Sequence, residues 1–375
     1  MLDSKNQFSS LYVGIFFSFV LINSSYAQYS DTIRLNDIRI LASHNSYKKK
    51  PDPKVLSFLD HFRKRLGDDL DPKRLDYGHL PLSEQFDDYG IRGIELDVYY
   101  DPKGGKFSKR KLNFLIGGLK QKVNDSVMDL PGFKMLHIAD IDYETHYLTF
   151  KSALEEIYQW SNNNPQHIPL YITIEPKGES PGDYSGILRL LGFKKAIKYD
   201  SIAYQALDNE ISDIFKNTSI LFTPKDLMAG QKSISERLKT TNWPTLNSCL
   251  GKVIFILDGD QNDIYQTSLE NGEERPMFTF SEPGKKTAAF IKRNNPIGQE
   301  EGINKMTNEY IVRTRSDVET MHARSGDYSM FNAAMISNAQ IISTDYYRED
   351  PKIGSFKISL DSFKTLSNLP FIFRM

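Results

Sequence analysis

The alternation of short apolar, β-branched segments with helical stretches is the feature that most constrains how this chain folds. Strands that alternate with helices indicate βαβ units and a parallel sheet. Nine segments are predicted to be strands: Ile38–Ala42, Ile91–Val98, Lys134–His137, Pro169–Ile174, Ser219–Phe222, Lys252–Leu257, Met277–Phe280, Tyr310–Thr314 and Gln340–Ser343. Four stretches are predicted to be helices: Thr149–Asn162, Ile202–Phe215, Ile234–Leu238 and Tyr328–Ser337.

A single α/β domain, a (β/α)8 TIM barrel over residues 28–375, explains this repeat best. Such barrels have about 250 residues, and more with insertions, and the glycine-rich fingerprint of dinucleotide-binding folds does not follow the first predicted strand. One predicted strand is then in excess, and we expect it to be Ser219–Phe222 or Met277–Phe280. Long charged insertions at about Lys48–Leu82 and Lys103–Val127 are expected to shape a pocket at the catalytic face.

The N-terminus reads as a signal peptide. Leu11–Ile22 is almost wholly apolar, Lys5 precedes it, and the small residues Ser25 and Ala27 form a cleavage pattern. The run is too short for a bilayer span, which needs about 20 apolar residues, and no later stretch of the sequence reaches that length. We expect cleavage of residues 1–27 and a secreted or periplasmic protein. A buried N-terminal helix or strand is the alternative.

Charge and cysteine content narrow the functional classes. Lys and Arg number 47 against 48 Asp and Glu, so the net charge is -1. Without a basic excess, non-specific nucleic-acid binding is not expected. The one cysteine, Cys249, has no partner for an internal disulfide and is expected in the core. The basic run Lys48–Lys50 has two equal interpretations: its lysines attract an anionic membrane surface, or they lie in a solvated loop.

Polar residues collect where four predicted strands end: His44, Asn45, Glu95, Asp97, His137 and Glu175. Glu95 and Asp97 are two residues apart, so a strand directs both to one face. Carboxylates that face a barrel interior are costly unless they are paired or bind a metal. A histidine at a strand end is often only structural, and a Glu-x-Asp pair is common on solvated edges. Four such strand ends together nevertheless favour an active site.

The chemistry of these side chains indicates a hard cation beside two histidines. Asn45, Glu95, Asp97 and Glu175 offer only oxygen ligands, which suit Ca²⁺ or Mg²⁺ rather than zinc. Histidine titrates near neutral pH, so His44 and His137 are candidates to take and to give a proton. A cation with two histidines suits phosphoryl transfer.

These residues stand in motifs that resemble the phosphatidylinositol-specific phospholipase C superfamily, in particular its bacterial calcium-dependent branch. The similar segments cover about residues 38–347 and occur in the same order. They are Ser43–Tyr47, Leu75–Gln85, Gly90–Val98, Asp101–Gly105, Met135–Tyr143, Trp160–Pro169, Glu175–Lys177, Phe222–Pro224, Arg313–Asp317 and Ser343–Tyr346. The charged stretch Pro51–Arg74 has no clear counterpart.

The resemblance implies a TIM barrel that acts on an inositol phospholipid headgroup at a membrane surface. It implies that Ca²⁺ is bound by Asn45, Glu95, Asp97 and Glu175. His137 matches the acid that protonates the diacylglycerol oxygen. An inositol hydroxyl next to the phosphate is then the nucleophile, and either His44 or Glu95 is its base.

Lys177, Arg313 and Arg315 are predicted to contact the phosphate or the inositol, since Arg binds phosphate bidentately. Salt bridges are the competing interpretation of these three residues. A glycerophosphodiester phosphodiesterase on the same barrel is disfavoured because it would carry Arg where Asn45 stands. A barrel that binds inositol lipids without catalysis is disfavoured because both histidines and all four ligand candidates are present. A glycosylated inositol lipid or another phosphodiester stays open as the substrate.

Overall fold

The computed structural model describes residues 32–66, 70–123, 125–216, 218–259 and 262–364. The nine strands are β1 Ile40–Ser43, β2 Gly93–Asp101, β3 Gly132–Lys134, β4 Leu170–Pro176, β5 Val253–Leu257, β6 Met277–Thr279, β7 Phe290–Lys292, β8 Ile311–Arg315 and β9 Ile341–Thr344. The helices are α1 Pro53–Leu66, α2 Pro72–Leu75, α3 Leu82–Asp88, α4 Lys111–Ile116, α5 Phe150–Asn163, α6 Pro181–Tyr184, α7 Gly186–Leu190, α8 Ser201–Phe215, α9 Pro224–Met228, α10 Ile234–Thr241, α11 Asp263–Glu270, α12 Glu300–Thr307, α13 Met321–Ser325, α14 Ser329–Ile336 and α15 Leu360–Lys364.

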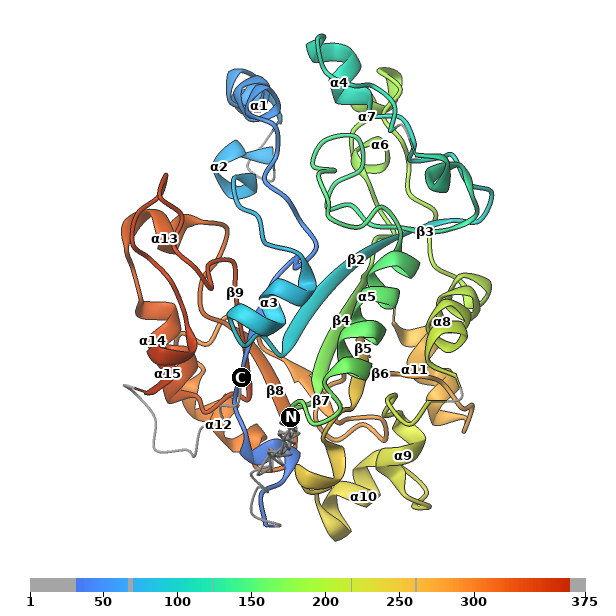
Figure 1. Cartoon of the computed structure of the whole chain (residues 1–375), viewed down its shortest axis with the longest axis vertical. Coiled ribbons are helices and arrows are strands. Elements are labelled where there is room, and N and C mark those ends of the chain that lie inside the picture. Colours follow the sequence, from blue (N-terminus) through green and yellow to red (C-terminus); the bar gives the residue numbers. More distant parts are fainter. Residues whose placement is uncertain (1–31, 67–69, 124, 217, 260–261, 365–375) are drawn as a thin grey trace, which may run out of the picture.

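Eight parallel strands form a nearly closed barrel. Their order around it is β6-β5-β4-β2-β1-β9-β8-β7, and every neighbouring pair in this order is parallel. A parallel bridge between Phe280 and Phe290 joins the two end strands, and the Ser281 amide donates to the Phe290 carbonyl at 3.0 Å. The helices lie outside the strands (Figure 1). The predicted TIM-barrel class is therefore confirmed.

The expected excess strand is Ser219–Phe222, and the strand prediction was wrong in two other places. Met277–Phe280 contains the barrel strand β6, whereas Ser219–Phe222 contributes only a parallel bridge from Leu221 to Val253. Gly132–Lys134 pairs antiparallel with the far end of β2 and lies outside the barrel, so Lys134–His137 is no barrel strand. The prediction missed β7, because three residues are too few for a periodic pattern. The four predicted helices correspond to α5, α8, α10 and α14.

The alternation along β2 has the predicted consequence. Ile94, Leu96 and Val98 are buried in the core cluster that also contains Leu154 and Ile157 of α5. Because successive side chains of a strand point to opposite faces, Glu95 and Asp97 are directed into the barrel. Cys249 is buried at 1% exposure, in agreement with the expectation of a core thiol.

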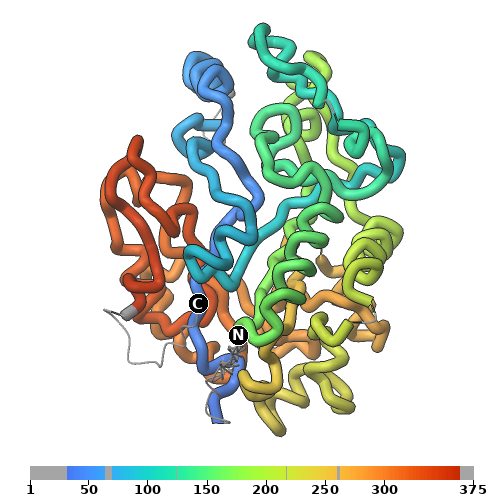
Figure 2. Tube along the Cα trace, in the orientation of Figure 1, coloured from blue at the N-terminus to red at the C-terminus, as the bar shows by residue number. Residues whose placement is uncertain are grey.

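The two charged insertions rise beyond the carboxyl ends of the strands. The first carries α1 and α2, and the second carries α4, which extends beyond β2 together with α6 and α7 (Figures 1 and 2). A separate small core holds this region together and includes Val55, Leu59, Leu112 and Leu188. Within the described residues, no helix is long and apolar enough to cross a membrane. The predicted signal peptide, residues 1–27, lies outside the described part of the chain.

Candidate functional site

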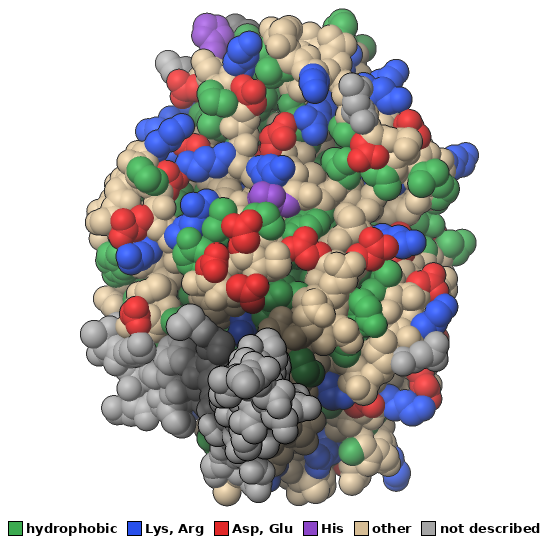
Figure 3. Space-filling view, viewed as in Figure 1, with side chains coloured by type: hydrophobic (Ala, Val, Ile, Leu, Met, Phe, Trp, Pro, Cys, Tyr) green, Lys and Arg blue, Asp and Glu red, His purple; other side chains and the backbone are tan. Residues whose placement is uncertain are grey.

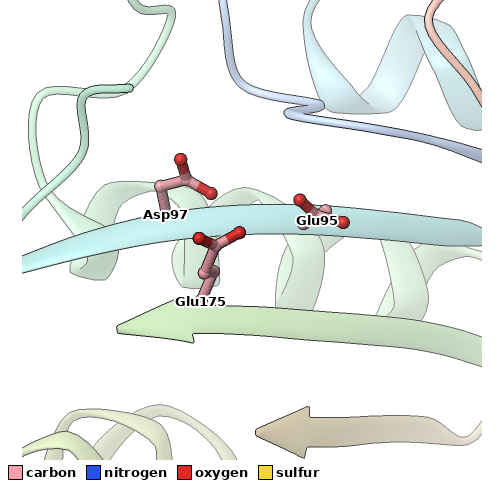
Figure 4. Close-up of side chains that lie close together, drawn as sticks. All are labelled: Glu95, Asp97 and Glu175. Carbon is pink, nitrogen blue, oxygen red and sulfur yellow. The ribbon is translucent and has the colours of Figure 1, made fainter. Parts of the chain in front are cut away.

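Strands β2 and β4 bring three carboxylates together at the barrel mouth. Asp97 lies opposite Glu175 in the parallel register of these strands, and Glu95 precedes Asp97 by two residues. One oxygen from each of the three carboxylates lies within 4.8 Å of the other two. Figure 4 shows the Glu175 side chain rising from β4 toward β2, which carries the other two. Two features of the sequence predicted this cluster: the Glu-x-Asp pattern of Glu95 and Asp97, and Glu175 at the end of another predicted strand.

Basic residues neutralise part of this cluster. Lys177 Nζ lies 2.9 Å from Asp97 Oδ2 and 2.7 Å from Glu175 Oε1. Arg313 pairs with Glu95. Burial raises the pKa of Asp97 well above its usual range. The neighbouring carboxylates also raise this pKa, whereas Lys177 lowers it. Burial also acts to raise the pKa of Glu175, but the Lys177 ammonium outweighs it and lowers this pKa to about 2.

The oxygens left without partners fit a hard cation. Asp97 is fully buried, Lys177 Nζ lies 2.9 Å from its Oδ2, and its Oδ1 has no hydrogen-bond partner in the described chain. The Asn45 Oδ1 atom is likewise buried without a hydrogen-bond partner in the described chain, while its Nδ2 donates to the Tyr77 hydroxyl at 2.7 Å. The Ser46 amide donates to the Glu95 carbonyl at 2.9 Å, which places Asn45 beside β2. Oxygen ligands of this kind suit Ca²⁺.

His44 follows β1 and is oriented by Asp345, which follows β9. The His44 Nδ1 atom lies 2.7 Å from Asp345 Oδ1, and Nε2 lies 3.4 Å from Glu95 Oε1. Because a carboxylate only accepts hydrogen bonds, Nδ1 carries the proton and Nε2 of the neutral ring is an acceptor. Burial, and then the nearby Arg315 guanidinium, hold the pKa of His44 well below its usual range.

His137 has a similar carboxylate partner. Its Nδ1 atom lies 2.8 Å from Asp142 Oδ2, and Lys48 Nζ lies 3.2 Å from the same oxygen. Burial acts to raise the pKa of Asp142, but Lys48 and the hydrogen bond from His137 outweigh it, so this pKa is lowered. Asp142 is therefore a carboxylate that can stabilise a protonated His137. His44 lines the cavity beside the acidic cluster, whereas His137 is not among the residues that line it.

A cavity of about 500 Å³ opens beside this cluster. Six of the predicted site residues line it: His44, Glu95, Glu175, Lys177, Arg313 and Arg315. Pro176, between Glu175 and Lys177, also lines it. Arg315 donates to Asp345 at 2.9 Å and approaches His44 Nε2 to 3.5 Å. Charged side chains from β7 and the loop after β5 complete the wall, where Lys292 pairs with Asp258.

Sequence reasoning did not assign roles to several of these residues. Asp142 and Asp345 stood in the motifs that carried the resemblance, and both are one hydrogen bond from a candidate histidine. Asp258 and Lys292 could have been found because each lies at the end of a barrel strand. For Lys292 this signal was lost with the missed strand β7.

The basic run after β1 is not a free basic surface. Lys48 is fully buried and donates to the carbonyls of Leu75 and Tyr77 at 2.8 and 2.9 Å. Lys50 pairs with Asp350 and lies 3.7 Å from Asp76. Only Lys49 of the three is exposed. Both interpretations of this run, an attraction for a membrane and a solvated loop, are therefore wrong for two of its three lysines.

Comparison with known proteins assigns a family to this arrangement. Solved structures with some likeness include a calcium-dependent phosphoinositol-specific phospholipase C from a Pseudomonas species, 15% identical over 85% of this chain and 92% of that chain, with a TM-score of 0.49. Another is a Ca²⁺-dependent phosphatidylinositol-specific phospholipase C from Streptomyces antibioticus, 13% identical over 83% of this chain and 95% of that chain, with a TM-score of 0.46. No curated protein matches the sequence.

The assignment itself comes from a family model. Residues 33–370 match the model of the Ca²⁺-dependent phosphoinositide phospholipase C family, which is nearly the whole described chain. The family's dependence on Ca²⁺ agrees with the acidic cluster of Glu95, Asp97 and Glu175. The chain belongs to the Ca²⁺-dependent phosphoinositide phospholipase C family.

Proposed function

We propose that this chain cleaves phosphatidylinositol to diacylglycerol and an inositol phosphate, in a Ca²⁺-dependent reaction with two histidines as proton carriers. The observation that carries the proposal is the placing of a neutral His44 Nε2 atom 3.4 Å from Glu95 Oε1, beside carboxylates suited to Ca²⁺. The family match over residues 33–370 supports the substrate class.

In the proposed reaction, the inositol hydroxyl next to the phosphate attacks phosphorus. His44 Nε2 or Glu95 Oε1 takes the hydroxyl proton, since both atoms face the same space. Ca²⁺ held by Asn45, Glu95, Asp97 and Glu175 would supply positive charge that favours the alkoxide and the charge on the phosphate oxygens. The new O–P bond forms as the bond from phosphorus to the diacylglycerol oxygen breaks, which yields a cyclic inositol phosphate.

His137 is proposed to protonate the diacylglycerol oxygen as it leaves. Its Nδ1–H donates to Asp142, so Nε2 is the atom available to the substrate. Asp142 stabilises the imidazolium that must be present before the proton is given up. The same ring can then accept a proton from water if the cyclic product is hydrolysed.

Three cations are proposed to bind the headgroup: Lys177, Arg313 and Arg315. All three line the cavity. Each holds an ion pair with an acidic residue of the site, namely Lys177 with Asp97, Arg313 with Glu95 and Arg315 with Asp345. These pairs keep the guanidinium and ammonium groups directed at the cavity, where a phosphate can add to their remaining donors.

The test is release of inositol phosphate from phosphatidylinositol in detergent micelles, with Ca²⁺ and with a chelator. We expect activity with Ca²⁺ that is lost in the chelator and in His137→Ala and Glu95→Gln, while Ile336→Ser on α14 serves as a surface control. Activity that survives chelation would overturn the metal assignment. Turnover of glycerophosphodiesters in place of this lipid would favour the glycerophosphodiester phosphodiesterase. Headgroup binding without cleavage of either substrate would favour a binding barrel.

We also propose that residues 1–27 direct export and are removed, which leaves a chain of residues 28–375 outside the cytoplasm. The support is the apolar run Leu11–Ile22 followed by Ser25 and Ala27. Mass spectrometry of the protein from culture fractions should find Gln28 at the N-terminus, in the periplasm or the medium. An intact Met1 in the cytoplasmic fraction would overturn this proposal.

A further inference from the structure

Residues 75–79, at the end of α2, lie against the loop that follows β1 (Figure 1). The His79 amide donates to the Lys48 carbonyl at 2.8 Å. A Cβ atom at Gly78 would lie 2.4 Å from the backbone nitrogen of Lys50, so this close approach of the two segments requires glycine. The 75–79 segment is therefore fixed beside the loop that carries one candidate base and one candidate cation ligand.

Tyr77 of this segment directs its hydroxyl at that loop. Tyr77 is only 3% exposed. Asn45 Nδ2 donates to the hydroxyl oxygen at 2.7 Å, and the same oxygen lies 3.5 Å from His44 Nδ1. The Tyr77 and His44 rings are stacked, with their centroids 6.3 Å apart and 17° between their planes. One hydroxyl group is thus next to both the candidate ligand and the candidate base.

The hydrogen bond to Tyr77 decides which end of the Asn45 amide can bind a cation. An amide side chain has one donor end and one acceptor end. Because Nδ2 is held at the Tyr77 hydroxyl, Oδ1 is directed elsewhere, and it is buried without a hydrogen-bond partner in the described chain. The Asn45 backbone has a φ of 49°, in the left-handed region that costs energy and persists only where the surroundings hold it.

Tyr77 is itself held by a buried cation. Lys48 Nζ lies 4.4 Å from the centre of the Tyr77 ring and donates to the Tyr77 carbonyl at 2.9 Å. On the face shown in Figure 3, many lysine and arginine side chains lie at the surface, whereas Lys48 is fully buried. Its ammonium is paired with Asp142 Oδ2 at 3.2 Å, since a buried charge requires a partner. The Tyr77 ring and backbone are therefore fixed by contacts that do not involve its hydroxyl.

We propose that Tyr77 is a positioning residue for Ca²⁺ binding: its hydroxyl holds Nδ2 of Asn45 and thereby leaves Oδ1 available to the cation. The inference rests on the proposed function, because that function includes Asn45 as a Ca²⁺ ligand. In this role Tyr77 acts through Asn45 and binds neither the cation nor the substrate. Loss of a residue that orients a metal ligand typically costs about 10- to 100-fold in metal affinity.

The test is a double-mutant cycle on Ca²⁺ affinity, measured by isothermal titration calorimetry with CaCl₂ and no lipid. Tyr77→Phe keeps the ring beside Lys48 and removes only the hydroxyl, and it is expected to weaken Ca²⁺ binding about tenfold or more. Asn45→Ala removes the ligand itself and should also weaken binding. In the Asn45→Ala background, Tyr77→Phe should have little further effect, because the two residues act as one unit.

Tyr265→Phe on α11 is the matched control. Tyr265 is 0% exposed, its hydroxyl donates to Asp208 at 2.8 Å, and the Arg275 guanidinium lies 5.1 Å from its ring centre. The control thus loses a buried, hydrogen-bonded hydroxyl beside a cation, as Tyr77→Phe does, but outside the candidate site. Its Ca²⁺ affinity should equal that of the wild-type chain. Urea unfolding in a chelator should show similar losses of stability in both variants, which checks that Tyr77→Phe folds.

Four outcomes decide between this inference and the proposed function. Wild-type Ca²⁺ affinity in Tyr77→Phe would overturn the positioning role, even if the chain cleaves phosphatidylinositol with Ca²⁺ and the proposed function stands. An equal loss from Tyr77→Phe in the wild-type and Asn45→Ala backgrounds would also overturn it, since Tyr77 would then not act through Asn45. The expected coupling together with cleavage supports both. The expected coupling without cleavage in micelles leaves the positioning role standing, while the proposed function fails.

Discussion

Asp142 contacts two side chains at once, an imidazole and an ammonium. Its Oδ2 atom is 2.8 Å from His137 Nδ1 and 3.2 Å from Lys48 Nζ, and Lys48 is fully buried. Lys48 also binds two carbonyls of the segment that precedes α3. A buried carboxylate held in this way orients the ring and sets its tautomer. At the residue scale, Asp142 therefore joins the loop that carries His137 to the first insertion, which carries Lys48.

Asp142→Asn is expected to lower kcat for phosphatidylinositol cleavage by about 100-fold or more, since the amide no longer stabilises a protonated His137. The alkaline limb of the pH profile should shift as well, because a general acid must hold its proton to act, and loss of packing alone would not move this limb. The measurements are kcat, KM and their pH dependence in micelles, with Ca²⁺ binding followed by calorimetry. Wild-type kcat with unchanged Ca²⁺ affinity would contradict the positioning role of Asp142.

Glu210 on α8, away from the candidate site, is expected to make the stability of the folded chain depend on pH. Burial raises its pKa to about 7, although the Phe133 amide donates to it, and its Oε2 atom lacks a hydrogen-bond partner in the described chain. The pKa of Glu210 in the folded chain exceeds the unfolded value near 4.5, so the folded chain favours the protonated carboxyl. The stability that Glu210 contributes is therefore fully present below pH 4.5 and is lost as pH rises through about 7.

Glu210→Gln should therefore be more stable than the wild-type chain at pH 8, by about 2 kcal/mol, and should lose that advantage toward pH 5. The measurement is the free energy of unfolding in urea at several pH values. Glu155→Gln, on the exposed side of α5, is the control for a lost surface charge. A difference between Glu210→Gln and wild type that does not vary with pH would refute the assigned pKa shift.

At the element scale, the long helices owe their ends to local chemistry. Asp200 caps α8 by accepting a hydrogen bond from the Ala203 amide at 2.8 Å, and Thr149 caps α5 through the Ser152 amide at 3.2 Å. These caps and the apolar stripes of both helices are readable in the sequence, which is why the predicted ends agree within one residue. The three residues of β7 offered no such pattern, and β6 was predicted only as one of two candidates for the excess strand.

Asp200→Ala should reduce the free energy of unfolding by about 1 kcal/mol, because an amide at the start of α8 loses its acceptor. Asp200→Asn keeps an acceptor oxygen and should cost much less. Chemical denaturation of the two variants beside wild type measures the difference. Equal losses in both would show that charge, and not the capping hydrogen bond, matters at this position.

At the scale of the whole molecule, the barrel gathers negative charge from distant parts of the chain. Glu95 and Asp97 come from β2 and Glu175 from β4, and all lie within ligand distance of one another. Burial raises the pKa of Asp97, and the Lys177 ammonium, 2.9 Å from Oδ2, only partly offsets this effect. A cation that binds only the folded chain stabilises it by mass action.

Ca²⁺ at 100 times its Kd should therefore stabilise the wild-type chain by about 2.7 kcal/mol, which appears as a rise in Tm. Asp97→Asn should show a smaller rise, because one carboxylate ligand of the cation has been lost. Differential scanning calorimetry with Ca²⁺, with Mg²⁺ and with chelator provides the comparison. An identical Ca²⁺ shift in both proteins would exclude Asp97 as a ligand.

The sequence by itself determined the class of fold and the face on which the carboxylates lie. Period-two alternation along β2 separates Ile94 and Leu96 from Glu95 and Asp97, and this is a local property of any strand. Helix periodicity likewise identified α5 and α8. His44 and Asn45, which follow β1, and Glu175, near the end of β4, were recognisable because polar groups at strand ends meet at one edge of a parallel barrel.

Only the tertiary structure decided which groups touch. Asp345 is 301 positions from His44 along the chain, yet their side chains lie 2.7 Å apart because β1 and β9 are neighbours in the barrel. The same packing turned Lys48 from an expected surface charge into a buried partner of Asp142. Short strands such as β7 become strands only when a neighbour supplies their hydrogen bonds. Contacts of this kind depend on strand order and register, which arise from long-range packing and leave no periodic signal in the sequence.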